Sequence, residues 1–200
     1  MNAISQIATP EVHASPAPLA TTDPTPLTAT NPTPLTAISP TPLAAMLAAI
    51  ASAARAPLAQ RPAAVAAALA AHAAAPDLLA GRDCPCNPDR YVRHLLAEGA
   101  GYAVVALVWR PGQLSPIHAH KAWCALAVHR GTMTEHHFAP GDPPRPTAAR
   151  LLEAGATSHG PADPDLIHRL GNCSAETAVT IHAYGVPYAR FAQDLNLLIG

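Results

Sequence analysis

The run GQLSPIHAHKAWCALAVHRG, residues 112–131, decides the expected fold because it holds two histidines at strand spacing between two glycines. It reads Gly112, five residues, His118-x-His120, three residues, Cys124, six residues, Gly131. Side chains two positions apart on a β-strand point to the same face, so both imidazoles are expected on one face. Imidazole is a good ligand for Fe, Zn, Cu or Ni. The run therefore predicts a β-rich domain with a metal site.

A second run, DLIHRLGN at residues 165–172, offers a further imidazole. His168 follows two aliphatic residues, as a strand residue would, and precedes Arg-Leu-Gly-Asn. Together the two runs resemble the paired metal motifs of the cupin fold, a jelly-roll β-barrel. They depart from that pattern at Cys124, where Glu is usual, and at Asp163 and Asp165, where Pro and Gly are usual.

We expect His168 to be the third metal ligand, with a hydrogen-bonded core histidine as the alternative role. His182 would serve on residue type alone, but the His-x3-Asn spacing favours His168. Three imidazoles without a carboxylate differ from the common iron site of two His and one carboxylate. A neutral ligand set leaves a divalent cation its full charge and favours an anionic substrate. A thiolate fits, since metal binding lowers the pKa of a thiol.

Composition limits the other classes of function. The 200 residues are 50% hydrophobic and 12% charged, with a net charge of −1, which fits one domain with a core mainly of Val, Leu, Ile and Ala. There is no basic face for nucleic acid and no apolar run of membrane-spanning length. The four cysteines, Cys84, Cys86, Cys124 and Cys173, are expected to be free thiols in a reducing cytoplasm.

The chain divides by composition into a tail and a folded domain. Residues 1–42 are a low-complexity Pro/Thr/Ala tail with an eight-residue Pro-x-Pro-Leu repeat, which predicts disorder. Residues 43–200 form the domain, with N-terminal helices within 43–80. Helices are expected at 43–55, 62–75 and 91–97, and strands at 102–109, 122–129, 132–138, 149–153, 165–170 and 178–184. The expected fold class is mainly β, a cupin-type jelly-roll barrel with N-terminal helices and a disordered Pro-rich tail.

Over residues 90–184 the chain resembles the cysteine dioxygenase type I family, the cupin-fold thiol dioxygenases. The resemblance is carried, in chain order, by Tyr91-Val-Arg93-His-Leu-Leu, Trp109-x-Pro-Gly112, Ile117-His118-x-His120, Cys124, Gly131-x-x-x-Glu135, Ile167-His168-Arg-Leu-x-Asn172 and Thr180-Ile-His182-x-Tyr184. It implies one Fe(II) per chain, held by His118, His120 and His168. It also implies that free L-cysteine binds the iron through thiolate and amine, and that both atoms of O2 are added to its sulfur, giving cysteine sulfinate.

The resemblance also assigns substrate and catalytic residues. Arg93, with Tyr91 beside it, matches the arginine that pairs with the substrate carboxylate; the alternative for Arg93 is a solvated helix residue. Thr180, His182 and Tyr184 match a hydrogen-bonded row that orients the tyrosine hydroxyl. Cys124 and Tyr184 match a pair that forms a thioether crosslink in animal-type members. The alternative for Cys124 is a small buried apolar residue.

Two other functions remain open. The first is a dioxygenase for 3-mercaptopropionate or a broader range of small thiols, with Arg190 as a second carboxylate partner. The second is a non-catalytic metal-binding cupin that acts as a sensor. The remaining histidines of the β-region, His129, His136, His137 and His159, are expected to be on the surface or incidental.

Overall fold

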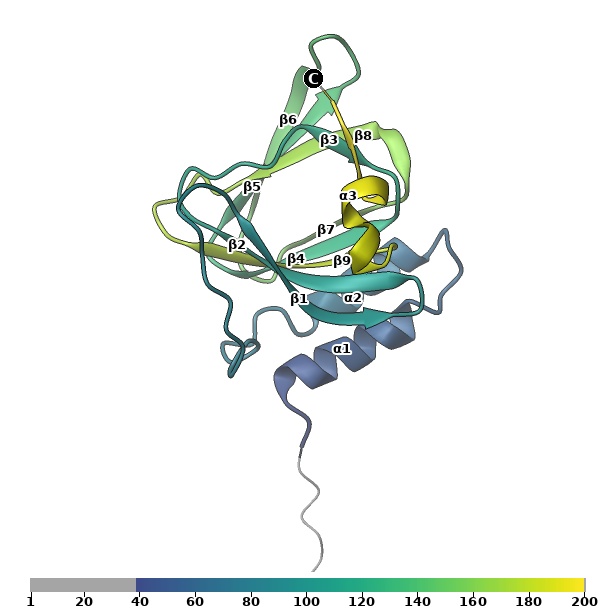
Figure 1. Ribbon diagram of the computed structural model, residues 1–200, viewed down its shortest axis with the longest axis vertical. Helices are drawn as coiled ribbons and strands as arrows, with labels where there is room; N and C mark the ends of the chain where they lie inside the picture. Colours follow the sequence, from purple (N-terminus) through teal and green to yellow (C-terminus); the bar gives the residue numbers. More distant parts are fainter. Residues whose placement is uncertain (1–38, 200) are drawn as a thin grey trace, which may run out of the picture. The chain divides into compact units, whose positions relative to one another are not determined.

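The computed structural model describes residues 39–199. Nearly all of the predicted tail, residues 1–42, lies outside the described residues. Two helices come first, α1 (Pro42–Ala53) and α2 (Arg61–Ala70), and strands dominate after them. The strands form a barrel of two sheets that face each other (Figure 1). The mainly β, jelly-roll architecture with N-terminal helices is therefore confirmed.

The barrel comprises two antiparallel sheets of five strands each within the described part of the chain. The first has the order β1-β2-β9-β4-β7 and the second β10-β3-β8-β5-β6. The strand bounds are β1 Val92–Gly99, β2 Tyr102–Trp109, β3 His118–His120, β4 Cys124–Arg130, β5 Met133–Ala139, β6 Arg145–Leu152, β7 Thr157–Gly160, β8 Asp163–Gly171, β9 Ala178–Tyr184 and β10 Asn196–Leu198. A short helical segment, η1 (Tyr188–Arg190) and α3 (Phe191–Asp194), precedes β10.

The first sheet is buried on both faces, which explains why β2 reads as a continuous apolar run. On its outer face Val104 and Ala106 pack in one core cluster with Ile50 of α1. On its inner face Val105 and Leu107 point into the barrel and join a second cluster. The helices thus pack on the outer face of the first sheet, and the inner face of the same sheet lines the barrel.

The two helices begin as their sequences predict. Thr41 caps α1 by accepting a hydrogen bond from the Ala44 N–H at 3.2 Å, and proline occupies the first turn of both helices. The second helix ends at Ala70, earlier than the predicted 75. The following turn is tied to the barrel by His129, whose Nδ1 lies 2.7 Å from the carbonyl oxygen of Ala73. His129, expected to be on the surface or incidental, is thus half-buried and makes a tertiary contact. No helix within residues 39–199 is long and apolar enough to cross a membrane.

The helix expected at residues 91–97 is wrong, because this segment is strand β1. It pairs antiparallel with β2 over the whole strand, from Val92 opposite Val108 to Gly99 opposite Tyr102. The run His-Leu-Leu-Ala-Glu has good helix formers, but sheet pairing overrides local propensity. Gly101, with φ of +77°, makes the tight turn between the strands. This strand, not a helix, places Arg93 at the barrel.

Three short or polar strand segments were not predicted from the sequence. The strands β7 and β10 were not predicted, since neither alternates in hydrophobicity and both lie at sheet edges. The strand β6 begins at Arg145 rather than at 149. Its second residue is Pro146, which strand β6 tolerates because it too is an edge strand.

Candidate metal centre

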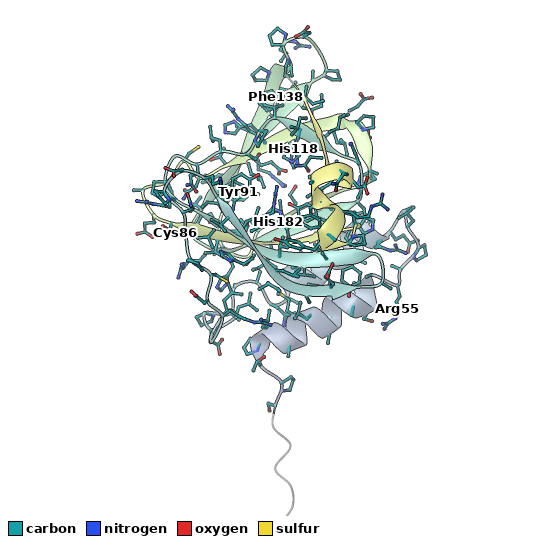
Figure 2. The ribbon with its side chains drawn as sticks, viewed as in Figure 1. Arg55, Cys86, Tyr91, His118, Phe138 and His182 are labelled. Atoms are coloured by element: carbon teal, nitrogen blue, oxygen red, sulfur yellow. The ribbon has the colours of Figure 1, made fainter. Side chains whose placement is uncertain are left out.

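Three buried imidazoles converge inside the barrel. His118 and His120 come from β3, and His168 comes from the neighbouring β8, where it is paired with His118. One ring nitrogen of each lies within 4.8 Å of the others, and all three residues are buried, with at most 8% exposed. Figure 2 shows His118 within the barrel. The structure therefore brings together the three ligands expected from the sequence.

Hydrogen bonds turn two of these rings so that Nε2 faces the cluster. The Nδ1 of His118 lies 2.9 Å from the carbonyl oxygen of Pro116, to which it donates. The Nδ1 of His168 lies 2.9 Å from Oε1 of Glu135. The Nε2 atoms of His168 and His120 are 3.1 Å apart. Two facing nitrogens share at most one proton, so at least one lone pair points into the cluster.

The electrostatics of the site suit a cation. Burial, and next the neighbouring imidazoles, lower the pKa of His118 to about 4 and that of His120 to about 3. Both rings are therefore neutral near pH 7 and offer lone pairs. Neutral, buried imidazoles with fixed orientation are the donors that Fe, Zn, Cu or Ni accept. The donor set thus fits a divalent transition metal.

One positive side chain faces the same cavity. Arg93 lines it from β1 together with Tyr91, and the Nη2 of Arg93 donates a hydrogen bond to the Tyr91 hydroxyl at 3.1 Å. Tyr91 is held in turn by stacking on Trp109, with ring centroids 4.2 Å apart. Within residues 39–199, the Arg93 Nε is buried without a hydrogen-bond partner. The guanidinium therefore has donor capacity left for a ligand in the cavity.

A row of hydrogen bonds runs along the inner face of β9. The indole N–H of Trp109 donates to Thr180 Oγ1 at 2.9 Å, and Thr180 Oγ1 lies 2.7 Å from His182 Nε2. His182 Nδ1 lies 2.8 Å from the Tyr184 hydroxyl. Burial keeps the pKa of His182 well below, and that of Tyr184 well above, its ordinary value. The row is thus neutral and ends at a phenol in the cavity.

Cys124 on β4 lies next to this phenol, on the strand that neighbours β9. It is paired with Tyr184 in the β4–β9 register, and both residues belong to the cluster inside the barrel. Burial raises the pKa of the Cys124 thiol to about 12, so the sulfur is protonated at neutral pH. All four cysteines of the chain, which lie within residues 39–199, are unpaired. Cys84 and Cys86 are partly or fully exposed, as expected of a loop.

Sequence reasoning gave no role to one residue of the site, Glu135. Its side chain is only 1% exposed, and it accepts hydrogen bonds from His168, Ser158 and Arg150. Burial alone would raise the pKa of this carboxyl, but the bonds from His168, Ser158 and Arg150 outweigh it and lower the pKa to about 2. The signal in the sequence was an acidic residue on an expected strand, within one of the motifs that carry the family resemblance.

Two other expectations are changed by the structure. Arg190, considered as a second carboxylate partner, is paired with Asp194 and 67% exposed, and it does not line the cavity. His137 and His159, expected to be on the surface or incidental, are half-buried and exposed respectively, and both line a second cavity that shares His120 and His168 with the first. The two cavities therefore meet at His120 and His168.

The chain is similar to several solved structures over about half of its length. A protein of Thermus thermophilus, TT1209, shares 18% identity with a TM-score of 0.44, covering 52% of this chain and 91% of that chain. A Klebsiella pneumoniae protein with a double-stranded β-helix domain shares 20% identity with a TM-score of 0.44, covering 58% and 90%. An oxalate oxidase shares 19% identity with a TM-score of 0.41, covering 50% and 53%.

A comparison with protein families covers more of the chain than these structures do. The family model described as cysteine dioxygenase type I matches residues 30–193. The match begins upstream of residues 90–184, which carried the resemblance in sequence, and takes in both α1 and α2. Since the model matches most of the chain and the three histidines of its barrel converge as described, the protein belongs to the cysteine dioxygenase type I family.

Proposed function

We propose that this protein is a non-haem Fe(II) thiol dioxygenase that adds both atoms of O2 to the sulfur of free L-cysteine, giving cysteine sulfinate. Membership of the family supports a metal-dependent dioxygenase of the cupin type. A thiol that bears a carboxylate, as L-cysteine does, is supported by one observation, the guanidinium of Arg93 in the cavity of the three histidines. We place the activity in the cytoplasm, where cysteines such as Cys86 and Cys173 stay reduced.

His118, His120 and His168 would hold one Fe(II) per chain. When bound, the iron would supply a Lewis-acidic centre that favours the thiolate over the thiol and the redox activity that O2 requires. The ligand set contributes no negative charge, so an anionic sulfur is a favourable partner for the site. This complementarity is the physical reason to expect a thiol rather than a neutral alcohol or amide as substrate.

Arg93 recognises the carboxylate of the substrate in this proposal. A guanidinium presents a planar fork that matches a carboxylate, and the pair is strong where water is partly excluded. Arg93 has no acidic partner within the described residues, and its Nε has no hydrogen-bond partner there. The Tyr91 hydroxyl accepts a hydrogen bond from Nη2 of Arg93, and other N–H groups of the guanidinium remain available to a ligand. Because Arg190 lies outside the cavity, Arg93 is the arginine available to a substrate within it.

The substrate reaches the cavity past the same two residues. Tyr91 and Arg93 line the inner cavity. They also line a hollow on the surface, where Tyr188 and Phe191 lie beside them. Figure 1 shows α3, which carries Phe191, at the open end of the barrel. An amino acid entering here meets the guanidinium before it meets the histidines. Its carboxylate is therefore held at the outer end and its thiol at the inner end.

The row on β9 would orient the Tyr184 hydroxyl so that its proton points towards the reacting atoms. An indole N–H can only donate, so Thr180 accepts from Trp109 and has its own proton free for His182 Nε2. His182 then carries its proton on Nδ1 and donates to the Tyr184 oxygen. The phenol proton of Tyr184 is left to donate into the cavity. Tyr184 would thus stabilise negative charge on the oxygen atoms or the sulfur during the transfer.

Cys124 and Tyr184 are the pair for a thioether crosslink. The bond would join the Cys124 sulfur to a ring carbon of Tyr184, with the loss of two hydrogen atoms, and O2 would be the oxidant. Their direct pairing across β4 and β9 supports this reaction. The crosslink would fix the ring of Tyr184 and so the direction in which its hydroxyl points.

Oxygen uptake with a panel of thiols tests the proposed function. The protein, loaded anaerobically with Fe(II), is mixed with L-cysteine, 3-mercaptopropionate, cysteamine or a buffer blank in an oxygen electrode. The highest kcat/KM is expected for L-cysteine, because it adds an amine, a further group for the iron, to the thiol and carboxylate that 3-mercaptopropionate also has. A higher kcat/KM for 3-mercaptopropionate would replace L-cysteine as substrate. Tight metal binding without oxygen uptake with any thiol would favour a sensor and overturn the proposal.

A further inference from the structure

We propose that Glu135 is a positioning residue of the metal centre, which fixes the tautomer of His168 and supplies the negative charge that three neutral imidazoles lack. This role rests on the proposed metal site but not on thiol oxidation. The carboxylate missing from the ligand set is then present one hydrogen bond further out.

The fold places Glu135 directly behind His168. Glu135 lies on β5 and His168 on β8, and these strands are paired, with Glu135 opposite Leu170. The Oε1 atom of Glu135 lies 2.9 Å from His168 Nδ1 and accepts a bond of 2.9 Å from the Ser158 hydroxyl. The Oε2 atom accepts from Arg150 Nη2 at 2.9 Å. All the bonds to the carboxylate thus come from donors on three different strands.

The surroundings give no packing reason for a carboxylate at this position. Met133, two residues earlier on the same face of β5, is fully buried, and so is Leu152 opposite it on β6. Leu170, opposite Glu135, belongs to the same apolar cluster as both. An apolar residue at 135 would extend this core. Burying a charge instead is costly unless the charge is paired, so its partners are the reason for it.

The bond to Glu135 sets which nitrogen of His168 carries a proton. A carboxylate can only accept, so Nδ1 of His168 is protonated and Nε2 presents its lone pair to the cluster. Metal-binding histidines commonly donate their other N–H to a carboxylate, which orients the ring and makes it a stronger ligand. The site is thereby arranged before any cation binds.

Of the three ligands, His168 alone has an anionic partner within the described residues. His118 donates to a backbone carbonyl, and the polar groups beside His120, which are the Leu195 backbone and the Asn196 side chain, are uncharged. The hydrogen bond of Glu135 therefore orients one ligand, His168. Arg150, whose side chain is 51% exposed, shares the charge of Glu135 from the solvent side. It should weaken the field of the carboxylate at the metal without changing the tautomer.

Two variants separate orientation from charge. Glu135→Gln removes the charge but keeps an oxygen that can accept from His168, whereas Glu135→Met removes both. Zn(II) and Co(II) dissociation constants are measured for the metal-free proteins by competition with a chromophoric chelator. Both variants should bind each metal about 10–100-fold more weakly than wild type, Glu135→Met the more so. Affinities equal to that of wild type in both variants would overturn the proposal.

Arg150→Met is the matched control, because it removes a charged partner of Glu135 and leaves the carboxylate in place. It should keep the metal affinity at or above the wild-type value. A loss as large as that of Glu135→Met would show that the hydrogen-bond cluster matters for packing rather than for charge, and would also overturn the proposal.

The tautomer is read directly from long-range ¹H–¹⁵N spectra of the imidazole rings in the metal-free protein. His168 should be protonated on Nδ1 in the wild type and in Glu135→Gln, and should lose this preference in Glu135→Met. Protonation of His168 on Nε2 in the wild type would overturn the proposal even if neither variant folds. Neither measurement uses a thiol or O2, so failure of the proposed dioxygenase activity would leave the test intact.

Discussion

Cys124 and Tyr184 lie directly opposite each other on β4 and β9, with both side chains inside the barrel. Directly opposed residues of an antiparallel pair have Cβ atoms about 4.5–5.5 Å apart. A short sulfur-to-ring bond can form at such a distance with small side-chain adjustments. The residue that departs from the cupin motif therefore lies where it can react with Tyr184.

The first prediction is that this pair becomes crosslinked during turnover. After incubation with Fe(II), L-cysteine and O2, the intact mass should fall by two hydrogen atoms, and a peptide joining β4 to β9 should be found. Cys124→Ser should show neither change. An unchanged mass after many turnovers, with Cys124 still alkylated after unfolding, would contradict the prediction.

The second prediction concerns Arg93 and the substrate carboxylate. Arg93→Gln should lower kcat/KM for L-cysteine by an amount equivalent to about 2–5 kcal/mol, mainly through KM, because the carboxylate loses its charged partner. Cysteamine, which has no carboxylate, serves as the matched substrate. The variant should change its kcat/KM far less. Equal losses for the two substrates would mean that Arg93 supports the site without contacting the carboxylate.

The third prediction concerns the row of hydrogen bonds that ends at Tyr184. Tyr184→Phe should lower kcat about 10²–10⁴-fold with little change in KM, because a proton donor acts in the transition state rather than in binding. Thr180→Val should lower kcat as well, since it leaves His182 Nε2 and the Trp109 N–H unpaired.

Thr180→Ser is the control for that row, because it keeps the hydroxyl between Trp109 and His182. It should retain most of the activity that Thr180→Val loses. Thr180→Val should also unfold more easily, by about 1–3 kcal/mol, as buried polar groups lose their partners. A Thr180→Val protein with wild-type kcat would show that the row does not orient Tyr184.

The sequence predicted the three converging histidines better than the residues that orient them. His118 and His120 share a strand face, and the spacing around His168 is that of a motif, so local pattern was sufficient to predict that these three histidines converge. The position of β2 was predicted to the residue because Tyr102–Trp109 is apolar on both faces. Such features depend on neighbours along the chain.

Other features depend on neighbours across the sheet. The residues after Tyr91 are good helix formers, and only pairing with β2 makes them a strand. The polar β7 becomes a strand because β4 offers an open edge. Glu135 meets His168 only through the register of β5 and β8, which no local pattern reveals.

The fourth prediction is an acid destabilisation of the metal-free protein that comes from the histidines. Burial lowers the pKa of His118 from 6.5 to about 4 and that of His120 to about 3. The unfolded chain therefore binds more protons than the folded one below about pH 6.5. The free energy of unfolding should fall as the pH drops from about 6.5 towards 3.

Urea unfolding across this pH range measures the effect. His118→Gln should show a shallower fall, because it removes one of the two groups. A saturating metal should delay the fall, since bound imidazoles cannot be protonated. A wild-type free energy of unfolding that does not change between pH 7 and pH 4 would contradict the lowered pKa values.

The most direct test of the central claim is the origin of the oxygen atoms in the product. Iron-loaded protein is supplied with L-cysteine under ¹⁸O2 in ordinary water, and the sulfinate is analysed by mass spectrometry. A dioxygenase predicts cysteine sulfinate that carries two ¹⁸O atoms, with one O2 consumed for each cysteine. A product with one ¹⁸O atom or none, or no sulfinate at all, would contradict it.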